Sequence, residues 1–93
     1  MVETTASKIE TVYDGLKALQ LIKNKNYGDS ALFPLGVFSK VPGNEQIKCR
    51  LDDKLSRVRN STELRKNDVC DLVGYLVLLM ISEEWTEFED LID

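Results

Sequence analysis

Two carboxylates and a tyrosine in the second half of the chain have the types and spacing to take part in binding chemistry. Asp68, Asp71 and Tyr75 follow one another at intervals of three and four residues within the most apolar run of the sequence. On a helix, at about 100° per residue, this spacing places all three on one side. A carboxylate in apolar surroundings is costly unless it meets a cation, a metal ion or hydrogen-bond donors. The function therefore depends on what Asp68 and Asp71 face.

The preceding segment offers the matching cations. Lys54 falls within an apolar helical stripe, and Arg50 and Arg57 flank that stripe on one side. A hairpin of two helices would bring these cations opposite the acidic row. One interpretation is a pocket in which the cations neutralise phosphate and Asp68 and Asp71 hold Mg²⁺. The other is a structural ion-pair network that sets the register of the two helices.

A third candidate group lies at residues 23–30. The ring of Tyr27 can stack on a base, and Gly28 allows a close approach to the backbone. The neighbouring side chains that could contact a phosphate or a base are Lys23, Asn24, Lys25 and Ser30. The alternative is an ordinary helix C-cap and turn with a packed tyrosine.

Composition narrows the classes of function. The chain has 93 residues, a net charge of −4 and no histidine. The acidic balance argues against a nucleic-acid-binding protein. Without histidine, Cys/His zinc sites and Ser-His or Cys-His catalytic pairs are excluded. Cys49 and Cys70 are too few for a disulfide framework, so we expect reduced thiols and a cytoplasmic protein. No signal peptide is recognisable and the apolar run is too short to span a membrane, so no membrane partner is expected.

Hydrophobic periodicity predicts a single all-α domain over residues 1–93, with three or four helices. The first helix is predicted over about 7–24, with Ser7 as N-cap and Glu10 completing a capping box, and residues 1–6 are expected to be frayed. The second helix follows Pro42-Gly43 with Asn44 as N-cap and ends near residue 60. The third covers about 66–82.

Two further segments complete the expected architecture. Residues 27–43 form one long loop whose many apolar side chains favour an ordered flap with a short helical turn near 30–33. Residues 83–93 are acidic but carry Trp85, Phe88 and Ile92, a spacing that allows an amphipathic fourth helix. A single core in so short a chain is thin, so a homo-oligomer is expected.

Three motifs occur in order over roughly residues 20–80. They are Lys23-Asn24-x-x-Tyr27-Gly28-x-Ser30, Asp53-Lys54-Leu-Ser-Arg57 and Asp68-x-x-Asp71-Leu-x-Gly74-Tyr75. Together they resemble the nucleotide modification-associated domain family of phages and bacteria, from which the third motif departs by its shorter acidic spacing. The resemblance implies a phage-type protein with a nucleotide-related role in the cytoplasm of a bacterial host.

A fainter resemblance is to the all-α nucleoside triphosphate pyrophosphohydrolases of the MazG and dimeric dUTPase type. Asp68 and Asp71 are similar to the E-x-x-D helix with which those enzymes bind Mg²⁺. Their preceding helix carries the motif E-E-x-x-E, whose nearest match here is Asp52-Asp53-Lys54-Leu55-Ser56, where Ser56 replaces the last acid and Lys54 intrudes. The incomplete carboxylate set therefore favours a protein that binds a nucleotide over one that hydrolyses it.

These observations predict a protein that binds a nucleotide or nucleotide-derived signal without a cofactor, sequestering it to counter host defence. One alternative is a Mg²⁺-dependent (deoxy)nucleoside triphosphate pyrophosphohydrolase. Another is an acidic inhibitor that docks on a host protein.

Overall fold

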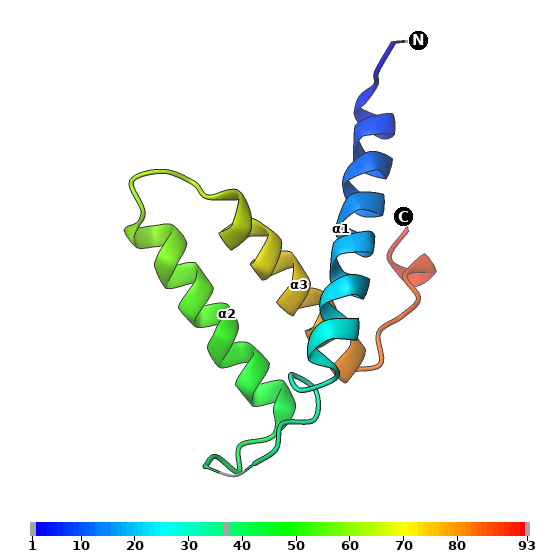
Figure 1. Cartoon of the computed structure of the whole chain (residues 1–93). Helices are drawn as coiled ribbons and strands as arrows, with labels where there is room; N and C mark the ends of the chain where they lie inside the picture. The colour runs from blue at the N-terminus through cyan, green and yellow to red at the C-terminus, as the bar shows by residue number, and fades with distance from the viewer. Residues whose placement is uncertain (1, 37, 93) are drawn as a thin grey trace.

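The chain folds into three α-helices and one short 3₁₀ turn in a computed structural model that describes residues 2–36 and 38–92. In chain order these are α1 (Thr5–Tyr27), α2 (Gly43–Asn60), α3 (Lys66–Ser82) and η1 (Glu89–Leu91), as Figure 1 shows. Within the described ranges no strand occurs, which confirms the all-α prediction. None of the helices there combines the length and apolar character needed to cross a membrane.

The helix α3 is the centre of the arrangement. It forms a hairpin with α2, and the C-terminal half of α1 crosses its other side (Figure 1). The N-terminal half of α1 extends beyond this crossing. Ile47 on α2 is the one apolar side chain within the described residues that is fully buried. The predicted bounds of α3, about 66–82, are confirmed. The helix is continuous because its apolar run has no internal helix breaker apart from Gly74.

The start of α1 differs from the prediction. Thr4, not Ser7, is the N-cap, so Thr5 and Ala6 are helical instead of frayed. The hydroxyl of Thr4 accepts a hydrogen bond from the backbone N–H of Ser7 at 3.0 Å, and the Ser7 hydroxyl accepts one from the Thr4 N–H at 2.9 Å. A serine at the third helical position can thus act as the reciprocal partner of a capping box, and Glu10 is not needed there.

The start of α2 has no side-chain cap. It is instead defined by the close approach of the Gly43 and Leu32 backbones. Pro42 is the N-cap residue and makes no capping hydrogen bond, so the prediction of Asn44 as N-cap was wrong. A Cβ atom at Gly43 would collide with the backbone carbonyl of Leu32. Glycine is therefore required where the long loop returns to α2, because any side chain would push these two backbone segments apart.

The long loop is apolar but only partly packed. Its first residues form the expected turn, in which the N–H groups of Leu32 and Phe33 donate to the carbonyl of Asp29 at 3.0 and 2.8 Å. Leu32 is half-buried, whereas Phe33, Leu35 and Phe38 are exposed. Val37, another apolar residue of this loop, lies outside the described residues. Phe33, Leu35 and Phe38 therefore do not pack on the described part of this chain.

Between residues 83 and 92 the tail forms no fourth α-helix, contrary to the expected amphipathic one. Directly after α3, Glu84 adopts φ 62°. The N–H of Trp85 donates to the carbonyl of Met80 at 2.8 Å, and the N–H of Glu84 donates to that of Ile81 at 3.0 Å. This is a Schellman motif, which turns the chain out of the helical path. Only the short η1 turn follows, and Trp85, Phe88, Leu91 and Ile92 remain exposed.

Candidate ligand pocket

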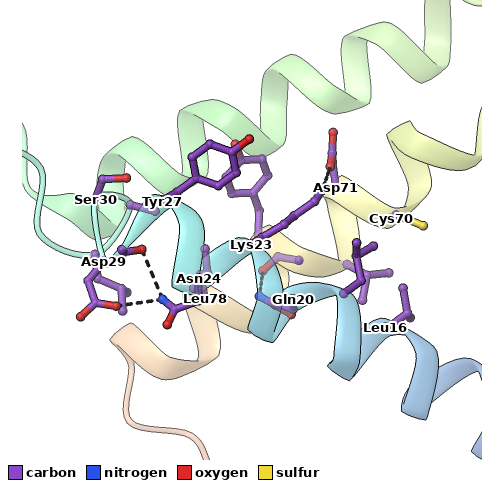
Figure 2. A pocket seen from close by; sticks show the side chains of 17 residues that line it. Leu16, Gln20, Lys23, Asn24, Tyr27, Asp29, Ser30, Cys70, Asp71 and Leu78 are labelled. Atoms are coloured by element: carbon purple, nitrogen blue, oxygen red, sulfur yellow. Dashed lines mark hydrogen bonds and ion pairs between the residues drawn. The ribbon is translucent and has the colours of Figure 1, made fainter.

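A cavity of about 280 Å³ lies between the C-terminal half of α1, the turn at residues 28–32 and α3 (Figure 2). Its walls combine an apolar floor with a polar rim. The apolar side chains include Leu16, Leu19, Leu32, Val73 and Leu78. The polar and aromatic side chains include Gln20, Lys23, Asn24, Tyr27, Asp29, Ser30, Asp71 and Tyr75. Segments far apart in the sequence, the first and third predicted motifs, therefore share one pocket.

At the rim, Asp71 pairs with two lysines. Its Oδ1 lies 3.2 Å from Nζ of Lys23 on α1, and its Oδ2 lies 3.0 Å from Nζ of Lys54 on α2. The Lys54 side chain is only 15% exposed, whereas that of Lys23 is 48% exposed. Two ammonium groups on one carboxylate leave a charge of +1 at the bridge itself, although the carboxylate of Asp29 also lines the pocket, and the exposed Lys23 is accessible to a ligand.

The titration of Asp71 reflects this pairing. Burial by itself raises the pKa of the carboxyl, because it disfavours the charged form. The hydrogen bonds and charges of Lys54 and Lys23 outweigh burial, and they hold the pKa of Asp71 below its ordinary value of 3.8. At neutral pH the group is therefore an ionised bridge between the lysines.

Two tyrosines stand at the pocket. The guanidinium of Arg50 lies over the ring of Tyr75, 5.8 Å from its centroid, a cation–π contact between α2 and α3. Tyr27 ends α1 and lines the cavity with an exposed side chain (Figure 2), so its ring is accessible to a ligand. One aromatic ring is thus held by a cation and the other is free to bind.

The turn after Tyr27 is shaped by Gly28 and Asn24. Gly28 has φ 64° and ψ −154°, a conformation available essentially only to glycine. No atom lies within 4 Å of a Cβ placed there, so the glycine is required for its backbone angles and not for a close approach within the chain. Nδ2 of Asn24 donates to the carbonyl of Gly28 at 3.2 Å and to Oδ1 of Asp29 at 2.9 Å. Asn24 therefore holds the turn that forms one wall.

Gln20 is a pocket residue that the sequence reasoning missed. Its Nε2 donates to the backbone carbonyl of Gly74 at 3.0 Å and so joins α1 to α3 (Figure 2). This bond directs the amide nitrogen toward α3 and fixes the orientation of the side-chain amide. The signal was present, because Gln20 is a polar residue at the phase of Leu16 on the otherwise apolar face of α1.

The remaining predicted residues lie elsewhere. Arg57 pairs with Asp53 on its own helix, Nε to Oδ2, at 3.5 Å, and neither it nor Lys25 lines the pocket. Asp68 is 4% exposed and also lies outside the lining. No cation of residues 2–36 or 38–92 comes within 4.0 Å of its carboxylate in an ion pair. Across those residues, no three acidic or sulfur side chains gather in a group able to hold a metal ion.

No family model, curated protein or solved structure matches the chain. The geometry of the pocket is therefore the basis for interpreting its function.

Proposed function

We propose that the protein binds a nucleotide or a nucleotide-derived signal in the pocket between α1 and α3. The observation that carries the proposal is the Lys23–Asp71–Lys54 bridge at the edge of an apolar cavity that is flanked by two tyrosines. A ligand with a flat ring and an anionic group matches this combination of surfaces. The cavity of about 280 Å³ is slightly smaller than the usual range for small-molecule sites, about 300–1,000 Å³. The ligand would thus place its base inside and its phosphate at the rim.

The lysines would have different roles. Lys23 is half-exposed and would contact the phosphate directly, since a charge-assisted hydrogen bond to phosphate is among the strongest polar contacts in water. Lys54 is largely buried and would support the site by holding Asp71. Asp71 would orient Lys23 toward the rim before the ligand arrives, which lowers the entropy that binding must overcome.

Sequestration is the form of binding that we favour, with a phage-type protein holding a host defence signal intact. It is supported by the pairing of both Asp71 oxygens with lysine, which leaves this carboxylate engaged when no ligand is present. Hydrolysis would require Asp71 to leave both lysines and to coordinate Mg²⁺ together with Asp68, which lies outside the pocket lining.

Chromatography of ligand mixtures tests the proposal. The protein would be incubated with canonical and modified nucleotides, cyclic nucleotides and ADP-ribose derivatives, with and without Mg²⁺, and then heat-denatured. A ligand that is depleted and returns unchanged indicates sequestration. A product that forms only with Mg²⁺ indicates a pyrophosphohydrolase. If no ligand is depleted or converted, the proposal fails and an inhibitor that docks on a host protein becomes the better hypothesis.

Lys23→Ala and Lys25→Ala provide a matched pair, because the two lysines are two residues apart on one helix and only Lys23 lines the pocket. We expect Lys23→Ala to weaken binding about 10- to 100-fold, as for the loss of a charged hydrogen bond of about 1.5–3 kcal/mol. Lys25→Ala should bind like the wild type by isothermal titration calorimetry. Equal losses in both variants would indicate a diffuse charge effect and would contradict a site at the α1–α3 pocket.

A further inference from the structure

The single chain leaves much more surface in water than a compact protein of its size. Its accessible surface is 8126 Å², whereas a folded monomer of 10.6 kDa exposes about 5,500 Å². Its radius of gyration is 15.5 Å, against about 12 Å for a compact domain of this length. The excess of roughly 2,600 Å² is of the size that one subunit contributes to a large obligate homo-oligomeric interface.

The exposed surface includes a regular apolar seam on α3. Val69, Val73, Leu76 and Met80 are spaced by four, three and four residues, the spacing of alternating d and a positions in a coiled coil. Val69, Leu76 and Met80 are between 36 and 43% exposed, although they lie on the central helix of the fold. The α3 seam, as we call these four residues, is therefore a third side of α3, in addition to those that meet α2 and α1.

We infer that the α3 seam is covered by the α3 seam of a second copy of this chain, which forms a two-fold symmetric dimer. A two-fold contact requires one surface that is complementary to itself, and a seam of aliphatic side chains without charge meets this condition. Each copy has a net charge of −4, which opposes association, but Asp71, the one charged residue between Val69 and Met80, lies outside the seam. The contact thus avoids like-charge repulsion where the copies meet.

The rest of the excess surface is available to enlarge the same interface. The N-terminal half of α1 extends past α3 (Figure 1). It exposes Ile9, Val12 and Tyr13, which line a shallow depression with Thr5 and Lys8. A small domain with one fully buried apolar side chain among its described residues needs additional burial to be stable, and a second copy provides it. The inference is independent of the proposed ligand, since the seam residues other than Val73 do not line the pocket.

Sedimentation velocity of the full chain without ligand tests the inference. The wild type should sediment at twice the chain mass of 10.6 kDa at micromolar concentration. Leu76→Glu should raise the dimer dissociation constant at least about 100-fold, because each copy would bury an unpaired charge. Leu55→Glu is the matched control on the exposed face of α2 and should remain dimeric. A monomeric wild type, or a dimeric Leu76→Glu variant, would overturn the inference.

Cross-linking decides the question if Leu76→Glu fails to fold. Leu76→Cys and Leu55→Cys would each be made with Cys49→Ser and Cys70→Ser, and treated with a bismaleimide that spans about one helix diameter, ~10 Å. Covalent dimers should form from Leu76→Cys and be several-fold scarcer from Leu55→Cys. Equal yields would show that α3 is not at the contact between copies.

Discussion

Asp71 joins the three helices through one side chain. It lies on α3, and its carboxylate oxygens pair with Lys23 of α1 and Lys54 of α2 at 3.2 and 3.0 Å. Helical phase predicted that Asp71 would face Lys54. It did not predict Lys23 as a second partner, because that pairing depends on where α1 crosses α3. One carboxylate therefore both joins the three helices and positions the lysine charges at the candidate site.

The low pKa of Asp71 leads to a prediction about stability at acid pH. Because the folded-state pKa is below the unfolded value, the contribution of Asp71 is complete above the unfolded pKa and is lost as pH falls through the folded pKa. We expect the free energy of unfolding of the wild type to fall more steeply below about pH 4 than that of Asp71→Asn. Urea unfolding at a series of pH values measures this difference.

Asp53→Asn is the control for that experiment. Asp53 pairs with Arg57 at 3.5 Å on an exposed helix surface, where ion pairs contribute little. Its pH profile should follow that of the wild type. If Asp71→Asn and the wild type have the same slope between pH 5 and pH 2, taken as about the range of carboxylate titration, the lysine bridge does not form in solution.

Tyr27 leads to a prediction about binding without a change in stability. Its ring is exposed beside the pocket, so Tyr27→Leu should leave the melting temperature nearly unchanged. Loss of a stacking partner should weaken nucleotide binding about 5- to 100-fold, since base–aromatic stacking is worth about 1–3 kcal/mol. Tyr13→Leu, an exposed tyrosine outside the pocket, is the calorimetric control. An unchanged Kd for Tyr27→Leu would place the base elsewhere.

At the scale of elements, the helix ends and the loop set the shape of the pocket. The angles of Gly28 end α1 and direct the chain into the turn that carries Leu32. The absence of a side chain at Gly43 allows α2 to begin directly against the backbone of Leu32. The loop wall of the cavity is therefore held at both ends by glycine, for two different physical reasons.

Replacement of Gly43 tests this close packing. Gly43→Ala introduces a Cβ that collides with the Leu32 backbone, which cannot rotate away as a side chain could. We expect a loss of about 1–3 kcal/mol in the free energy of unfolding, as for overpacking elsewhere. Weaker ligand binding should accompany it, because Leu32 lines the cavity.

Gly15→Ala is the matched control, because Gly15 lies inside α1 and has no atom within 4 Å of the added methyl. Alanine should stabilise this helix by about 0.5–1 kcal/mol. Chemical unfolding of both variants measures the change in the free energy of unfolding, which should be a loss for Gly43→Ala and a gain for Gly15→Ala. A neutral Gly43→Ala would mean that α2 begins farther from the Leu32 backbone than in this structure.

At the scale of the whole molecule, the open arrangement predicts that stability depends on protein concentration. The chain exposes 8126 Å², and association with a second copy, as we infer above, would stabilise it by mass action. The melting temperature of the wild type should rise by several degrees, about 4–8 °C for each kcal/mol gained, as concentration increases 100-fold. Differential scanning calorimetry at several concentrations measures this shift. Leu76→Glu should show no such dependence, and a constant wild-type Tm would contradict obligate association.

The sequence determined the helical class and the hairpin. The apolar run of α3 and the stripe of α2 are local periodic features, and periodicity is sufficient to place them. The faces of Lys54 on α2 and of Asp71 on α3 follow from each helix alone, whereas their contact depends on how the two helices pack. The cap of α1 was misplaced because two hydroxyl residues three apart, Thr4 and Ser7, can each serve as the N-cap in a local pattern. The absence of a helix directly after α3 was not evident from the sequence, because Glu84 adopts a left-handed conformation that sequence rules assign to glycine.

Only the tertiary structure decided what the pocket contains. The crossing of α1 over α3 brings Lys23 to Asp71 and Gln20 to the Gly74 carbonyl, over separations of 48 and 54 residues. In the folded chain Arg57 pairs with a residue of its own helix, and Asp68 lies outside the cavity lining. Helical phase fixes which residues share a face of one helix. Which faces meet depends on the packing of all the helices together, a long-range property that no local pattern carries.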